Sequence, residues 1–245
     1  MKKLSIIMII TILCGFHLSA LTADEIVHKV DQNETFKTAK STGSMIIVDR
    51  FGERKSDFIA YSEGEVNTLI EFTSVEEEGQ KVLRVKGKMY LYFPDAEEVI
   101  LLQGSALKEG LLGSDISYED MAGEKDTLKN YTATLEGSEN IDGADCYIVH
   151  LQAKPKKKVA YAEYTIWVDK STFAMRKANY FSLSGKIIKE MTALDFKKIA
   201  GKYVATKMIM KDMLKKNSRT EMIINDIEVN IDLPKDIFSL SALSF

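Results

Sequence analysis

The feature that most constrains this chain is a series of short β-branched or aromatic runs that recur about every ten residues. Turn signals such as Glu63-Gly64-Glu65, Asp142-Gly143 and Ser184-Gly185 separate them. This spacing predicts consecutive antiparallel hairpins, and because long crossover helices are missing, a parallel sheet is not expected. The expected strands are 45–48, 57–61, 66–74, 81–85 and 88–93 and, resuming at residue 131, 146–153, 160–168, 173–181, 187–197, 203–213 and 220–231.

Several of these strands are apolar on both faces. Met45 and Ile47 face one way, while Ile46 and Val48 face the other. A single layer with a solvated back would alternate more cleanly between apolar and polar residues. Either a second layer covers each face, or one face lines an apolar hollow.

Two helical regions are expected beside the strands. The first begins at a capping box formed by Thr22 and Glu25 and ends near Lys40, where Ser41-Thr42-Gly43-Ser44 breaks the pattern. The second is the stretch from 104 to 123, which predicts a short helix over 105–113. A further helical turn over 114–121 is expected to be capped by Ser114 or Asp115.

The N-terminus is typical of a secretory signal peptide over residues 1–20. Two lysines precede an uncharged run from Leu4 to Leu13, and small residues follow, which indicates cleavage after Ala20 or Ala23. The protein is then exported, with one domain over 24–245. Membrane association is the alternative if Cys14 carries a lipid or the signal stays uncleaved.

Charge and cysteine content exclude some classes of protein. Loss of Lys2 and Lys3 takes the net charge from -3 to -5, which does not suit a nucleic-acid binder. The basic run 154–158 is interpreted as a solvated loop, with contact to anionic headgroups as the alternative. Cys146 has no partner in the exported chain and is expected to be a buried apolar side chain.

Few residues offer chemistry. His28 and His150 lack metal-ligand spacing, and we expect the first on the surface and the second as a hydrogen-bonded structural residue. Asp115, Glu119 and Asp120 could hold a cation, but helix capping explains them better. No enzyme activity, metal or cofactor is expected. Nine methionines remain after cleavage, and this flexible side chain suits a surface that accepts apolar ligands of varied shape.

Several segments resemble outer-membrane lipoprotein-sorting proteins of the LolA/LolB-like superfamily. They are Lys88–Pro94, Leu112–Asp120, Tyr164–Lys170, Ser184–Lys186, Asp195–Val204 and Asp236–Ser239, and the string Gly-Ser-Asp-x-Ser-Tyr-Glu-Asp is the most specific. The resemblance covers nearly the whole exported chain. It implies an incomplete antiparallel β-barrel around an apolar cavity, with the N-terminal helix and short lid helices over the opening.

The resemblance also implies a function. The protein would be a monomeric periplasmic carrier that takes acyl chains of lipoproteins, or another lipid, from an inner-membrane donor to an outer-membrane acceptor. An arginine on an early strand latches the lid in well-studied carriers, but neither Arg50 nor Arg54 matches that motif. The expected lid residues are Leu107, Leu111 and Leu112, and the expected cavity residues are Met45, Ile47, Phe58, Ile70, Phe72, Met89, Leu91, Trp167, Met191, Met208 and Met210.

Two other readings stay open. A sensor of the same fold would bind a lipoprotein and regulate a partner protein. A structural, surface-exposed envelope protein would need no ligand. Co-purification of a membrane regulator would distinguish the first, and protease accessibility on intact cells the second.

Overall fold

A single antiparallel sheet of 13 strands forms the molecule, in the order β6-β5-β4-β3-β2-β1-β13-β12-β11-β10-β9-β8-β7. The computed structural model describes residues 21–122 and 126–244, so the expected signal peptide, Ala20 and Cys14 lie outside the described residues. The strands are β1 (Thr38–Asp49), β2 (Gly52–Glu63), β3 (Asn67–Phe72), β4 (Lys81–Val85), β5 (Lys88–Phe93), β6 (Glu98–Leu102), β7 (Tyr131–Ile141), β8 (Ala144–Ala153), β9 (Glu163–Asp169), β10 (Met175–Phe181), β11 (Ile187–Ile199), β12 (Lys202–Asp212) and β13 (Arg219–Val229).

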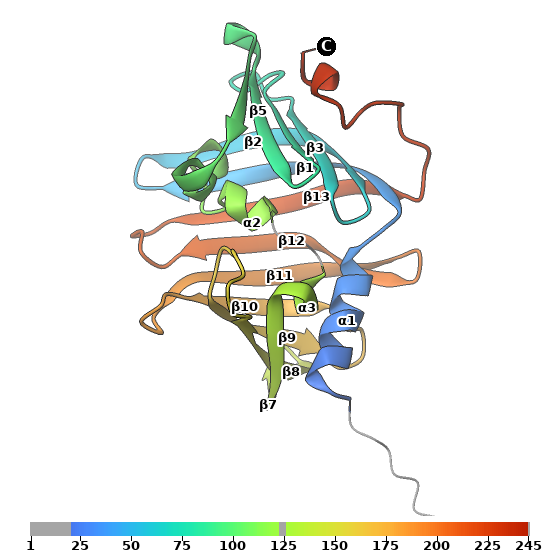
Figure 1. Cartoon of the computed structure of the whole chain (residues 1–245), viewed down its shortest axis with the longest axis vertical. Helices are drawn as coiled ribbons and strands as arrows, with labels where there is room; N and C mark the ends of the chain where they lie inside the picture. Colours follow the sequence, from blue (N-terminus) through green and yellow to red (C-terminus); the bar gives the residue numbers. More distant parts are fainter. Residues whose placement is uncertain (1–20, 123–125, 245) are drawn as a thin grey trace, which may run out of the picture.

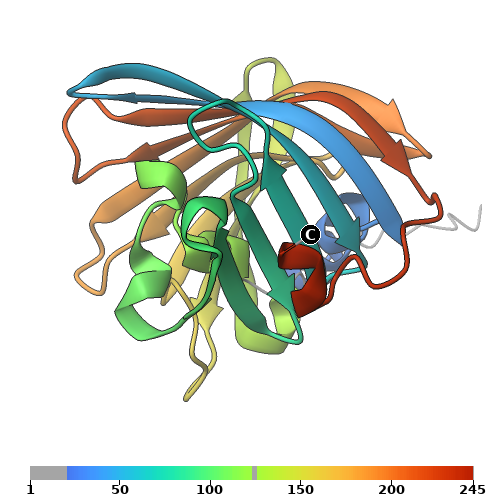
Figure 2. The same ribbon diagram turned by 90° about the horizontal axis from the view of Figure 1, so that it is seen from above.

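The sheet curves but does not close, because β6 and β7 are its two free edges. It arches over the helices in two perpendicular views (Figures 1 and 2). The expected mainly β architecture is therefore confirmed as one open antiparallel sheet with an N-terminal helix and short helices, while the enclosed apolar cavity stays a prediction. These are α1 (Ala23–Glu34), η1 (Pro94–Ala96), η2 (Gly104–Lys108), η3 (Leu111–Gly113), α2 (Tyr118–Ala122), α3 (Thr127–Asn130) and η4 (Leu240–Leu243).

The chain crosses the sheet once. From β6 at one edge it must reach β7 at the other, and the described parts of that connection, residues 103–122 and 126–130, lie on the concave side. We call residues 104–122 the insert. The strand order requires a long connection here, and the packing of Leu111 and Tyr118 against the buried cluster of β1, β2, β3 and β5 places the insert on the concave face.

Helix α1 begins as the sequence predicts and ends earlier. The Thr22 Oγ1 accepts a hydrogen bond from Glu25 N, and the Glu25 carboxylate accepts one from Thr22 N at 2.8 Å. The expected end at Lys40 is wrong, because the helix stops at Glu34 and β1 begins at Thr38.

The presumed helix breaker around Gly43 is the middle of β1. A bulge against β13 falls between Thr42 and Gly43. A Cβ on this glycine would lie 2.6 Å from Cζ of Phe58 and 2.3 Å from the Ile223 carbonyl oxygen. Glycine is needed because the Ile223 backbone carbonyl and the Phe58 ring both approach the strand here, not because the chain turns.

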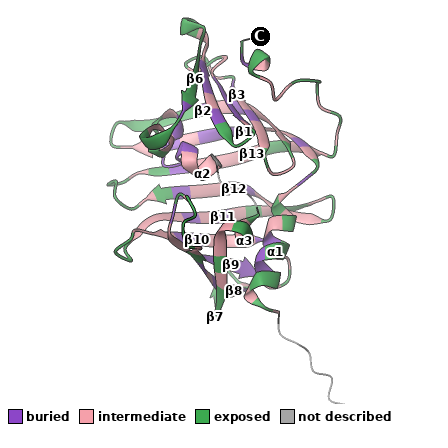
Figure 3. Ribbon diagram, in the orientation of Figure 1, coloured by how far each residue is buried: buried purple, intermediate pink, exposed green. Residues whose placement is uncertain are grey.

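Apolar cores lie on both faces of the sheet, which explains the weak alternation. The concave face carries two buried clusters, one under α1 and one under the insert (Figure 3). On the other face, the C-terminal segment places Leu243 and Phe238 against Leu69, Leu83 and Tyr92. The second layer thus covers the convex face only near β3, β4 and β5.

Most expected strands are confirmed, with longer bounds at β1 and β2. Strand β6 was not expected, since its five residues follow β5 after a single turn of 3₁₀ helix. The division into a signal peptide and one domain over 24–245 stays a prediction.

Candidate functional site

Methionines form part of the floor of the concave face. Met222 pairs with Met45 of β1 on one side and with Met208 of β12 on the other. In the adjacent row Met210 pairs with Met191 of β11. Met222 packs against both concave clusters, so this unbranched, adaptable side chain lies where the two clusters join.

Ten of the eleven expected cavity residues lie on the concave face. Sheet periodicity places alternate residues of a strand on one face, and the registers agree from strand to strand. Met191, Met208 and Met210 belong to the cluster under α1. The cluster under the insert holds Met45, Ile47, Phe58, Ile70, Phe72, Met89 and Leu91.

Trp167 is on the other face, and its assignment to the cavity is wrong. Its neighbours Ile166 and Val168 are the residues that join the concave cluster. The Trp167 indole Nε1 donates to Glu139 Oε2 at 2.6 Å, and Lys177 Nζ lies 5.1 Å from the ring centroid. The indole therefore packs among charged groups on the convex side.

Helix α1 covers the first cluster. Ile26, Val27 and Val30 are buried against strands of the second half of the sheet. Asn33 bonds the Tyr203 backbone in both directions, at 2.9 Å each way. Lys202 Nζ donates to carbonyl oxygens at the C-terminal end of the helix, which favours a cation there.

The insert covers the second cluster with its leucines. Leu111 is fully buried, and Leu107 and Leu112 pack on the same cluster. The expected helix over 105–113 is instead two separate 3₁₀ turns. Leu112 has a left-handed backbone, φ 51°, which is unfavourable for a residue with a side chain. All three expected lid residues face the sheet in this structure.

Asp115 fastens one side of the insert to the β12–β13 turn. Its side chain is 0% exposed and its Oδ1 accepts from Ser218 Oγ at 2.6 Å and Lys215 Nζ at 3.1 Å. Its backbone N–H donates to Thr220 Oγ1. Its Oδ2 is buried without a hydrogen-bond partner among the described residues, so part of the desolvation cost is not offset.

Asp120 fastens the other side. Its Oδ2 accepts from Lys189 Nζ of β11 at 2.5 Å and from Ser117 N and Oγ, and its Oδ1 accepts from Tyr161 Oη at 2.6 Å. Ser117 is thus the polar partner at the start of α2, and the expected cap at Ser114 or Asp115 is wrong. Ser114 instead bonds the backbone of Ile116.

The Asp115 and Asp120 carboxylates each have their own lysine. Among residues 21–122 and 126–244, no group of three or more His, Cys, Asp or Glu is arranged to hold a metal ion. The arrangement of Asp115, Glu119 and Asp120 therefore does not support a cation site.

Four tyrosines pack against one another on the concave side, and one of them, Tyr161, contacts Asp120. The ring centroids of Tyr161 and Tyr180 are 4.5 Å apart, and those of Tyr131 and Tyr164 are 4.9 Å apart. Burial raises the pKa of Tyr131 to about 12, and burial together with the Asp120 charge holds the pKa of Tyr161 still higher. The Tyr131 and Tyr161 hydroxyls stay protonated and act as donors, the first to the Tyr161 carbonyl and the second to Asp120 Oδ1.

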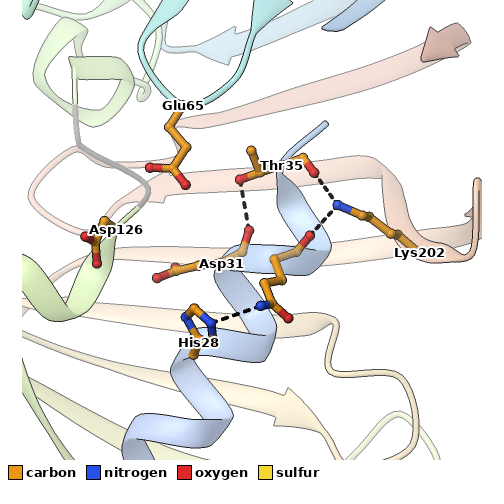
Figure 4. A pocket seen from close by; sticks show the side chains of 7 residues that line it. His28, Asp31, Thr35, Glu65, Asp126 and Lys202 are labelled. Carbon is orange, nitrogen blue, oxygen red and sulfur yellow. Dashed lines mark hydrogen bonds between the residues drawn. The ribbon is translucent and has the colours of Figure 1, made fainter. Parts of the chain in front are cut away.

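A polar pocket of about 540 Å³ lies at the C-terminal end of α1 (Figure 4). Asp31 accepts there from Thr127 N at 3.0 Å and Thr127 Oγ1 at 2.8 Å, so it caps α3 from a neighbouring helix. Burial raises the pKa of Asp31 to about 6, against the opposing effect of these hydrogen bonds. The pocket is lined by His28, Asp31, Gln32, Thr35, Glu65, Asp126 and Lys202.

The remaining sequence expectations concern single residues. His28 is exposed and bonds Gln32, and His150 Nδ1 lies 3.1 Å from Thr165 Oγ1, as expected for a structural histidine. Cys146 is buried, and burial raises the pKa of its thiol.

Of the two candidate arginines, Arg54 lies beside the insert and Arg50 is exposed in the β1–β2 turn. Arg54 pairs with Asp49 at 3.2 Å, and its guanidinium lies close to Gly113. Arg50 stacks over the Phe51 ring. The buried contacts of the insert come from lysines 189 and 215, which sequence reasoning missed because each acts across at least 69 positions of the chain.

Among the described residues, no helix combines the length and the apolar character needed to cross a membrane.

Solved structures share this fold over nearly their whole length. A DUF1329 family protein from Desulfovibrio piger matches with a TM-score of 0.83 and 26% identity, covering 90% of this chain and 97% of its own. A structure from Vibrio parahaemolyticus, described as an outer membrane lipoprotein-sorting protein domain, matches with a TM-score of 0.81 and 19% identity, covering 91% and 98%. A LolA superfamily protein from Nitrosomonas europaea matches with a TM-score of 0.75 and 25% identity, covering 91% and 100%.

The comparison with curated proteins gave no match. A protein-family model described as "Uncharacterized protein" matches residues 64–244, which is most of the chain. The chain therefore belongs to that family, and its structure matches the LolA superfamily and an outer membrane lipoprotein-sorting domain.

Proposed function

We propose that this protein is an exported carrier that holds acyl chains of a lipoprotein, or of another lipid, against the concave face of its sheet. The observation that carries the proposal is that two apolar clusters on this face are covered by segments outside the sheet. A carrier needs such an arrangement, because a cover can leave the face without breaking any strand pairing.

An acyl chain needs an apolar binding surface to leave a membrane. Burial of apolar surface is worth about 25 cal/mol per Å², so an acyl chain does not cross water without an apolar partner. A row of methionines at the join of the clusters suits chains of different length and shape. The fold is also similar to that of a domain described as an outer membrane lipoprotein-sorting protein, which supports lipoprotein acyl chains as the cargo.

The insert is the cover that we propose to move. Its hold on the sheet rests on Asp115 and Asp120, whose lysine partners lie on a turn and on β11. Displacing the insert withdraws Leu111 and Tyr118 from the second cluster and frees an apolar surface there. No bond is made or broken, so transfer depends only on the relative affinities of donor, carrier and acceptor. We place the donor at the inner membrane and the acceptor at the outer membrane.

A tryptophan quenching experiment tests where the lipid binds. The chain has one tryptophan, Trp167, and it lies on the convex face. In a Trp167→Phe background, Met208→Trp places a reporter on the concave floor, while the unchanged chain is the matched control. A phospholipid with brominated acyl chains is added, and the same lipid without bromine corrects for other changes in emission.

We expect bromine-dependent quenching of the reporter at 208 and none of Trp167. Circular dichroism checks that each variant is folded, and Phe58→Trp in the same background gives a second reporter in the other cluster. If neither concave reporter is quenched, or if Trp167 is quenched equally, the concave face does not hold the lipid.

A further inference from the structure

Three neighbouring hairpin turns present large apolar side chains to solvent at one end of the central strands. We call this surface the docking edge, and it is distinct from the edge strands β6 and β7. Phe51 is 81% exposed in the β1–β2 turn and Leu183 is 94% exposed in the β10–β11 turn, with Leu214 at 66% and Met213 at 50% in the β12–β13 turn. Their six strands are adjacent in the sheet. Figures 1 and 2 show the three turns projecting side by side at the left of both views.

These apolar tips lie among cations. The three turns and the strand ends beside them carry eight basic residues and three acidic ones, and four of the basic residues pair with carboxylates: Arg54 with Asp49, Lys55 with Asp57, Lys215 with Asp115 and Arg219 with Glu221. The other four, Arg50, Lys186, Lys211 and Lys216, are exposed and supply the positive charge of this surface. The basic residues are Arg50, Arg54, Lys55, Lys186, Lys211, Lys215, Lys216 and Arg219, and the acidic ones are Asp49, Glu53 and Asp212.

The turns hold the apolar side chains away from the sheet. Phe51 N donates to Asp49 Oδ1 at 2.7 Å, and Leu214 N donates to Asp212 Oδ1 at 2.9 Å. Two of the three acidic residues are thus engaged in building the turns. The Arg50 guanidinium lies 4.6 Å from the Phe51 ring centroid, so an apolar group and a cation project together.

We propose that this edge docks on the surface of an anionic lipid bilayer. The apolar side chains project from separate turns, so each can insert into a lipid bilayer independently of the others. The surrounding lysines and arginines can pair with the phosphates of the lipid headgroups. The β3–β4 turn bounds the docking edge, because its exposed Val75 is followed by three glutamates, residues 76–78, which an anionic surface would repel.

Docking by this edge does not depend on cargo in the concave face. The apolar tips belong to none of the three buried clusters. A test with plain vesicles and no lipoprotein therefore examines the docking edge alone, and the quenching experiment above examines the cargo face.

Vesicle co-sedimentation of the exported chain tests the proposal. The vesicles are either phosphatidylcholine alone or equal parts of phosphatidylcholine and phosphatidylglycerol, at low and at high salt. One variant combines Phe51→Ser, Leu183→Ser and Leu214→Ser, and a second combines Lys186→Gln, Lys211→Gln and Lys216→Gln. Val75→Ser is the matched apolar control, and Lys156→Gln with Lys157→Gln is the matched charge control.

We expect binding to the anionic vesicles only, weakened by salt. Each lysine removed should lower the partition coefficient about fivefold, and the apolar variant should lower it by at least about tenfold. Both controls should bind as the unchanged chain does. Equal binding to neutral vesicles, no binding, or a loss caused only by the 156 and 157 changes would overturn the proposal. All changed side chains are exposed, and unchanged melting temperatures confirm that the variants fold.

Discussion

The two covers of the concave face are held by different forces. Helix α1 is a continuous 12-residue helix with a capping box, and it buries Ile26, Val27 and Val30. The insert is a set of short helical turns that packs Leu111 and Tyr118 into the second cluster and also depends on two buried carboxylates that pair with lysines. One cover is thus secured by apolar packing along a continuous helix, whereas the other adds two carboxylate–lysine pairs to its apolar contacts.

This difference indicates which cover can leave. The free energy that apolar packing contributes is lost in proportion to the apolar surface that becomes exposed. This free energy changes little with salt concentration. An ion pair with a partner in a turn or near solvent can be exchanged for water at a lower cost. The side chain of Lys215 is 45% exposed, so it is already partly hydrated when it holds Asp115. We infer that α1 is a fixed wall and the insert a removable one.

The largest expected effect comes from Asp120→Ala. The side chains of Asp120 and Lys189 are 10% and 13% exposed, so the change leaves a nearly buried ammonium without its carboxylate. We expect a loss of about 3–5 kcal/mol in the free energy of unfolding, measured by urea denaturation.

Asp145→Ala is the control for that change. Asp145 pairs with Lys170 at 3.0 Å, but its side chain is 66% exposed. An exposed pair contributes about 0–1 kcal/mol. Equal losses in the two variants would show that the insert is not held by a buried pair.

Apolar truncation compares the two covers directly. Ile26→Ala on α1 and Leu111→Ala on the insert both remove a fully buried side chain. We expect Ile26→Ala to cost about 3–4 kcal/mol, because the helix cannot shift to fill the space, and Leu111→Ala about 2 kcal/mol. A larger loss at Leu111 would reverse the assignment of fixed and removable covers.

A smaller effect is expected from the one carboxyl that joins α1 to α3. The pKa of Asp31 rises from 3.8 to about 6 on folding, because burial disfavours the charge more than the Thr127 hydrogen bonds favour it. Between about pH 4 and pH 6 the folded state binds more protons than the unfolded state, so stability falls as pH rises through this window. The side chain is partly solvated, and we expect a loss of only about 1 kcal/mol.

Thermal melts of the unchanged chain and Asp31→Asn between pH 4 and pH 6 measure that effect. The asparagine variant should show the flatter pH profile. A profile of the same slope would show that Asp31 does not titrate in this range.

Local patterns were enough to predict most of the fold. Alternation in β1 placed Met45 and Ile47 on one face, the family resemblance assigned that face to the hollow, and the Thr22–Glu25 box predicted the start of α1. The predicted end of that helix was wrong, because Gly43 makes room for the Ile223 carbonyl of β13 and the Phe58 ring of β2, contacts that no local pattern shows.

The contacts that fix the insert to the sheet could not be predicted for a related reason. Ser114 and Asp115 have the composition of a helix cap, and only the folded chain brings Lys215 and Ser218 to Asp115. The Trp167 assignment failed differently, because the alternation of the strand places Trp167 on the face opposite to Ile166 and Val168, and these two residues are the ones in the concave cluster.

Hydrogen exchange with and without bound lipid tests most directly whether the insert is the cover that moves. Peptides from residues 104–122 and from α1 are compared in the same sample before and after a diacyl phospholipid is added. We predict that the insert amides exchange faster in the lipid complex while the α1 amides keep their protection. Loss of protection in α1 with an unchanged insert would contradict the proposed route to the concave face.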